Sequence, residues 1–153
     1  MKNRQRHARI APVLLCLIVA ACGETEVPTM PVTVNGSVIA PAGVDTDGTV
    51  YVSLYHAWAL QGDLRHPVQF ISSHEVAVGP FSLDIEYPVE KGEGLLVYAW
   101  LDNDGDGVSC TPEDRNDLAG LTEVDAFPAE QVTVEVQLTA PCAGPDWFYP
   151  PAP

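Results

Sequence analysis

The amino-acid sequence predicts an all-β protein built as a single antiparallel β-sandwich of about seven strands. Several stretches alternate apolar and polar residues with period two, which is typical of half-buried strands. Turn signals rich in Gly and Pro separate these stretches at intervals of roughly 10 to 15 residues, as in small sandwich domains. No segment keeps the helical period beyond one or two turns.

Seven stretches of the chain predict strands. The alternation is clearest at 132–139, where valines take every second position between polar residues, and 94–102 is apolar enough to form a central strand. The turn signals that separate the stretches include PAGVDTDG, VGP and EKGEG. The predicted strands are 32–40, 49–57, 68–72, 75–88, 94–102, 118–124 and 132–139.

Residues 1–21 have the pattern of a secretory signal, with basic residues, a short apolar run and small residues at its end. The ending VAAC resembles the lipobox of bacterial lipoproteins. This resemblance implies that Cys22 carries a lipid that anchors the protein, and Gly23 in the next position implies transfer to the bacterial outer membrane. Residues 22–31 are then a tether. An ordinary cleaved signal that leaves a free cysteine is the alternative.

Without the signal the chain is strongly acidic. It contains 3 basic and 21 acidic residues, which gives a formal charge of −18. Such a surface repels nucleic acid and anionic membranes, so we expect no nucleic-acid partner. Cations are the expected counterpart.

The chain after the signal is long enough for one domain, which we place at 32–140. If Cys22 carries lipid, two cysteines remain in an oxidising compartment, and a disulfide between Cys110 and Cys142 is the simplest pairing. Two free thiols are the alternative. Residues 141–153 form a tail of prolines and aromatics, which either packs over an open end of the sandwich or stays exposed.

An acidic loop follows the apolar stretch 94–102 and matches the calcium-loop pattern D-x-[DN]-x-[DN]-G-x5-E. Calcium takes six to eight oxygen ligands, and alternate aspartates on a curling backbone converge on one centre. Several carboxylates held this close repel one another unless a cation neutralises them. An acidic turn without metal is the alternative. The predicted ligands are Asp102, Asp104, Asp106, the carbonyl of Val108, and Glu113.

The residues around the loop argue against an EF-hand, because a short, uniformly apolar strand enters it instead of an amphipathic helix. Residues 111–114 read T-P-x-[DE], which predicts one short helical turn that runs at most to about Ala119, before Gly120. The run YAWLDNDGDG resembles the calcium loops of Ig-like and transthyretin-like (prealbumin-like) sandwich modules in secreted bacterial proteins. That resemblance implies calcium ligation and no catalytic residue, and Cys110 at loop position 9 fits a disulfide to Cys142.

The remaining chemistry supports no enzyme. His56, His66 and His74 lack a zinc spacing and are predicted to be solvated or edge residues, and no nucleophile or phosphate-binding motif is present. Asp84 and Glu86 share a strand face, where solvation is the usual role of acids.

Three functions therefore stay open. The leading one is a calcium-stabilised, lipid-anchored module with a structural or interaction role, whose protein or glycan partner is unknown. The second is a carbohydrate- or peptide-binding module that uses a platform of exposed aromatic residues. The alternative for these aromatic residues is that they belong to the core of the sandwich, which would leave no platform. The third is a hydrolase that uses the acidic cluster. The aromatic residues concerned are Tyr51, Tyr55, Trp58, Tyr98 and Trp100.

Overall fold

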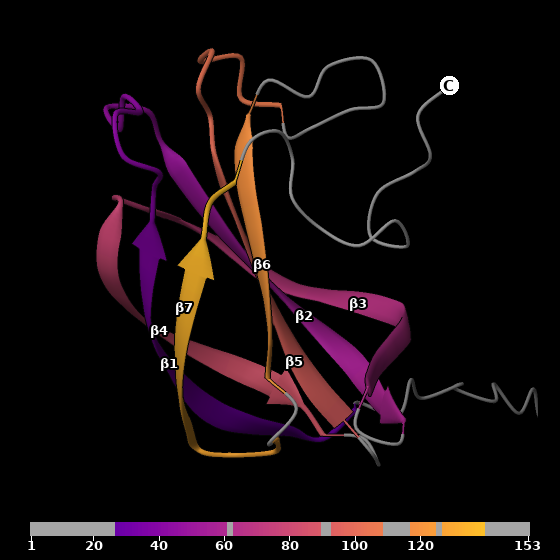
Figure 1. Cartoon of the computed structure of the whole chain (residues 1–153). Coiled ribbons are helices and arrows are strands. Elements are labelled where there is room, and N and C mark those ends of the chain that lie inside the picture. The colour runs from indigo at the N-terminus through magenta and orange to yellow at the C-terminus, as the bar shows by residue number, and fades with distance from the viewer. Residues whose placement is uncertain (1–26, 61–62, 90–92, 109–116, 125–126, 140–153) are drawn as a thin grey trace, which may run out of the picture.

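The computed structural model describes residues 27–60, 63–89, 93–108, 117–124 and 127–139, without side-chain detail for 58–60, 63–68 and 93. The described residues form seven strands arranged in two packed sheets, which confirms the predicted β-sandwich (Figure 1). The strands are β1 (Thr29–Ile39), β2 (Val50–Leu60), β3 (Asp63–Val76), β4 (Gly79–Pro88), β5 (Glu93–Leu101), β6 (Leu118–Val124) and β7 (Gln131–Gln137).

One sheet has the order β4-β1-β7 and the other the order β3-β2-β5-β6. All strand pairs are antiparallel except β1 and β7, which run parallel with Val34 opposite Val132. The parallel pair was not predicted. Period-two alternation identifies the buried face of a strand but not its neighbour, and β7 lies beside the first strand instead of pairing along its length with β6.

The strand order differs from that of a constant-type immunoglobulin domain. In that domain strand A pairs with B, and the sheets are ABED and CFG. Here β1 pairs with β4 and β7, and only the pairing of β2 with β5 is shared.

The strand boundaries differ from the predicted ones by up to five residues, and β1 begins at Thr29, within the predicted tether. The predicted strands 68–72 and 75–88 become the long β3 and the separate β4, with a turn at 77–78 that ends at Gly79, whose φ is +116°. The predicted helical turn from Thr111 lies mostly outside the described residues. The turn ends before Leu118, because Leu118 and Ala119 belong to β6 and pair with β5, in agreement with the predicted strand 118–124.

The main core lies between the two sheets and consists of aliphatic side chains with Tyr87. His56 also lies on the inner face of β2, fully buried, with its ring edge-to-face with Tyr87 at 5.5 Å between centroids. The prediction of a solvated His56 was therefore wrong, because alternation places position 56 on the same face as Val52 and Leu54. His74 is half-buried and contacts the Ser72 hydroxyl at 3.0 Å.

The outer faces of the two sheets differ in character. The outer face of β4-β1-β7 is polar, with Thr33 donating to Asp84 and Ser82 donating to Asn35. The outer face of β3-β2-β5-β6 instead carries a second apolar cluster around Trp100, on which Tyr51 stacks at 4.5 Å. We call this cluster the outer aromatic cluster; it consists of Ala57, Leu96, Tyr98, Trp100 and Ala119, with Tyr51, Tyr55 and Leu121 packed against it.

The edges of the two sheets meet where β6 approaches β7. Ala119 and Thr139 exchange two backbone hydrogen bonds of 3.2 and 2.8 Å, and the Thr122 hydroxyl donates to the Glu135 carbonyl at 2.6 Å. Gly120 allows this approach, because a Cβ there would overlap the Gln137 carbonyl. The sandwich is therefore closed along this side.

Candidate metal centre

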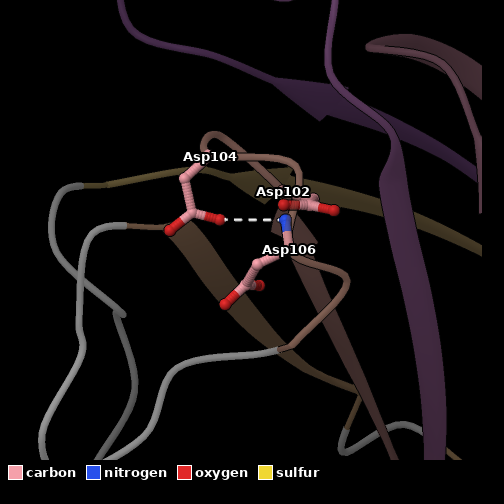
Figure 2. Close-up of side chains that lie close together, drawn as sticks. All are labelled: Asp102, Asp104 and Asp106. Carbon is pink, nitrogen blue, oxygen red and sulfur yellow. Dashed lines mark hydrogen bonds between the residues drawn. The ribbon is translucent and has the colours of Figure 1, made fainter.

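The acidic loop begins where β5 ends, at one end of the sandwich. Asp102 directly follows Leu101 and is buried, with 8% of its surface exposed, whereas Asp104 and Asp106 are exposed. One carboxylate oxygen from each of the three lies within 4.8 Å of the other two, so the cluster could hold a metal ion. Figure 2 shows the three side chains gathered on one tight turn of the chain.

Hydrogen bonds from the loop backbone hold these carboxylates in place. The two oxygens of Asp102 accept from the amides of Gly105 at 2.8 Å and Gly107 at 3.0 Å. Asp104 accepts from the Asp106 amide at 3.1 Å, drawn as the dashed line in Figure 2, and Asp106 accepts from the Val108 amide at 2.7 Å. Each aspartate thus orders the backbone that positions the next one.

The two glycines give the loop its curvature. Gly105 and Gly107 have φ values of +78° and +72°, in the left-handed region that other residues adopt only at a cost. Gly107 is position 6 of the calcium-loop pattern, where a sharp turn is required. The backbone therefore has the shape that brings alternate aspartates to one centre.

The loop is also attached to the neighbouring strands. The Asp102 amide donates to the Thr49 carbonyl, just before β2, at 2.9 Å. Gly48 makes this approach possible, because a Cβ there would overlap the Asp102 carbonyl. On the other side the Asn103 amide donates to the Asp117 carboxylate at 3.1 Å, just before β6. The acidic loop therefore joins the ends of β2, β5 and β6.

Asp117 is a fourth acid at this site, and the sequence motif did not identify it. Its side chain is 4% exposed. Burial raises the pKa of Asp117; the hydrogen bond from Asn103 opposes the rise, and the negative charges of Asp104, Asp102 and Asp106 add to it. The signal lay in the strand register, because Leu101 pairs with Leu118 and the next residues outward, Asp102 and Asp117, must then adjoin.

The other predicted site residues are only partly placed. Val108 is exposed, and its amide donates to Asp106. Glu113, Cys110, Cys142 and Cys22 lie outside the described residues, so the predicted twelfth loop position, the disulfide and the lipidation site stay predictions.

The donor set determines what this site can do. Carboxylate oxygens are the ligands of hard cations such as calcium and magnesium. Three acids within a few ångströms, with a buried fourth beside them, carry a repulsion that a bound cation would remove. The arrangement could therefore hold a hard cation at this end of the sandwich.

Comparison with known proteins adds no family assignment: no family model and no curated protein matches the chain. Within the part of the chain that the structure describes, no helix is long and apolar enough to cross a membrane.

Asp117 provides a test of the charge balance at the site. In EDTA we expect Asp117→Asn to stabilise the protein at neutral pH, because the neutral amide removes a buried charge and can still accept from Asn103. The raised pKa means that the folded protein holds this proton more strongly than the unfolded chain, so ionisation destabilises the fold as the pH rises above about 3.8. The difference in the free energy of unfolding between Asp117→Asn and the wild type should therefore become smaller towards low pH.

Urea unfolding of both proteins in EDTA, between acidic and neutral pH, measures this difference. In calcium the variant should lose part of its stability advantage over the wild type, or become the less stable of the two, because it offers the ion less negative charge. A constant difference at every pH and metal condition would mean that Asp117 does not share the electrostatics of the loop.

Proposed function

We propose that this chain is a calcium-stabilised β-sandwich module whose bound ion fastens the end of β5 to β2 and β6. The convergence of Asp102, Asp104 and Asp106 within 4.8 Å carries the proposal. The backbone hydrogen bonds of the loop support it, because they orient the three carboxylates together.

Calcium fits the donor set better than magnesium. The loop pattern offers three aspartates, the Val108 carbonyl and Glu113, which with water reaches the six to eight oxygens that calcium takes. Magnesium requires a near-ideal octahedron at shorter distances and keeps several waters. A loop whose strand ends are fixed in the fold suits a stabilising ion more than a conformational switch, since β5 and β6 are already paired across it.

The first experiment measures unfolding of the protein without its signal, in calcium and in EDTA. At calcium 100-fold above the dissociation constant we expect the free energy of unfolding to rise by about 2.7 kcal/mol. Magnesium at the same concentration serves as the control and should have a smaller effect. A midpoint that is the same in calcium and EDTA would remove the metal from the proposal.

We further propose that the protein is anchored to the bacterial outer membrane through lipid on Cys22 and acts there as a structural or interaction module. The signal pattern of residues 1–21 and its lipobox-like ending VAAC support this location. Labelling cells with a fatty-acid analogue should mark the wild type and leave Cys22→Ser unlabelled. Labelling of both proteins would place the acyl group elsewhere.

The strand order departs from the immunoglobulin pairing, so it does not support the Ig-like form of the resemblance. A carbohydrate or peptide platform built on Tyr98 and Trp100 has less support. Their side chains are 3% and 7% exposed, so a ligand could reach them only if something first moved away.

A further inference from the structure

The side of the sandwich opposite β6 and β7 ends in two outermost strands, β3 and β4. On the closed side the edges of the sheets are joined by the hydrogen bonds between Ala119 and Thr139. An outermost strand directs the N–H and C=O groups of every second residue away from its sheet, where a further strand can pair with them. Among the strands that the structure describes, β3 and β4 are therefore the two at which a sheet could be extended.

β4 is the more regular of these two strands. Ten consecutive residues, Gly79–Pro88, pair with β1 without a shift in register. The pairing of β3 with β2 instead shifts between Leu54 and Tyr55 and again between Ala57 and Trp58. Bulges of this kind twist an edge strand away from further pairing. The straight edge of β4, which we call the β4 edge, is therefore the better template for an added strand.

The side chains of β4 define what the added strand should look like. On the outer face Ser82, Asp84 and Glu86 are exposed. On the inner face Phe81 and Leu83 pack against the core but stay half-buried. A strand beside β4 would cover the open sides of Phe81 and Leu83 with its own inward side chains, since neighbouring strands align residues of the same face. It should therefore alternate apolar residues with polar or charged ones.

The charge on the outer face of β4-β1-β7 has one sign. None of the three strands contains a lysine or an arginine. A groove of about 390 Å³ on this face is lined by the carboxylates of Asp84 and Glu130, with Thr33 donating to Asp84 at 2.8 Å. Opposite charges on neighbouring strands attract, so the outward residues of an added strand should be basic. A lysine or arginine opposite Asp84 would lie beside this groove.

A second copy of this chain is a poor occupant of the same edge. Pairing of β4 with β4 would bring Asp84 and Glu86 of both copies onto one face of the joined sheet, where like charges on neighbouring strands repel. The chain after the signal also carries a formal charge of −18, so two copies repel each other as wholes. The charge of the face therefore favours a basic partner.

We propose that the β4 edge binds an extended segment of a basic partner protein, which adds to the sheet β4-β1-β7 as a further strand. Its basic side chains lie over Asp84 and Glu86, and its apolar side chains lie beside Phe81 and Leu83. In this mode of recognition main-chain hydrogen bonds supply affinity and alternate side chains supply specificity. The proposal rests on the interaction role proposed above and names the chemistry of its partner, but it does not depend on the metal.

Hydrogen exchange in the mature chain tests the strand pairing. With a synthetic peptide of alternating lysine and valine, as long as β4, we expect slower amide exchange in 79–88 and unchanged exchange in β3. A peptide of the same composition, with its lysines in one block and its valines in another, should give little protection. Protection of β3 instead of β4, or equal protection by both peptides, would overturn the proposal. Protection of β4 that grows with protein concentration, without peptide, would overturn it in favour of a second copy.

Charge substitutions test the recognition. Asp84→Asn/Glu86→Gln keeps the size of both side chains, and we expect it to weaken binding of the alternating peptide about tenfold, because exposed ion pairs each contribute a few-fold. Glu75→Gln/Glu123→Gln removes the same number of exposed charges from the other sheet and should bind nearly as well as the wild type. Equal losses in the two double variants would reduce the binding to general attraction by an acidic protein and overturn the proposal.

Fluorescence anisotropy of the labelled peptide measures these affinities in EDTA as well as in calcium. Binding at the β4 edge should be the same in both, because the groups that carry it lie outside the acidic loop. Peptide binding by a protein whose unfolding does not respond to calcium would keep this proposal and remove only the metal. A calcium effect on unfolding without peptide binding would do the reverse.

Discussion

Asp102→Ala is expected to lower the free energy of unfolding by about 4 kcal/mol in saturating calcium. About 2.7 kcal/mol of this is the stabilisation by calcium at 100 times its dissociation constant. A further loss of about 1 kcal/mol follows because the amides of Gly105 and Gly107 exchange partly buried hydrogen bonds to the Asp102 carboxylate for bonds to water. Urea unfolding in calcium and in EDTA separates the two contributions.

Two controls show which part of the loss belongs to the ion. Asp104→Ala should abolish the calcium effect but stay near wild type in EDTA, because the Asp106 amide that it releases is exposed to water. Asp45→Ala removes an exposed acid that accepts one turn amide, from Asp47 at 3.1 Å, outside the site. It should keep the full calcium effect. Equal calcium effects in all three variants would contradict the assigned site.

The acidic loop was predictable because its chemistry is local. The spacing of Asp102, Asp104 and Asp106 with Gly107 places the ligands and the turn within six residues. Asp117 was not predicted because it reaches the loop through the pairing of β5 with β6, 15 positions along the chain. A motif describes one stretch of backbone, whereas this fourth acid depends on the register of a hairpin.

The β-sandwich fold could be predicted from the hydrophobic pattern of the sequence, but the pairing of its strands and the packing of its core could not. Alternation located several of the strands, and a uniformly apolar run identified β5, because both patterns depend on which side chains avoid water. Alternation could not place β1 beside β7 in parallel, because that pairing joins the first and last of the seven strands, which are far apart in the sequence. Alternation does put position 56 on the face of Val52 and Leu54, but it could not show that the buried ring packs edge-to-face with Tyr87 of the other sheet.

Gly120→Ala is expected to lower the free energy of unfolding by about 3 kcal/mol, in calcium and EDTA alike. The new Cβ would overlap the backbone carbonyl of Gln137 and approach the Val136 side chain at 3.0 Å. A carbonyl within β7 cannot rotate away as a side chain can, so β6 and β7 must separate. That separation strains the two hydrogen bonds between Ala119 and Thr139. The measurement is again urea unfolding.

Gly36→Ala is the matched comparison, because it also adds a methyl group to a glycine that faces a neighbouring strand. Its Cβ would meet the ring of Phe81, which is a side chain and can shift. We therefore expect a smaller loss, and Phe81→Leu should relieve part of it by removing the ring. No side-chain substitution should relieve Gly120→Ala in this way. If both glycine variants cost the same, the close approach of β6 to β7 would not be what requires glycine at position 120.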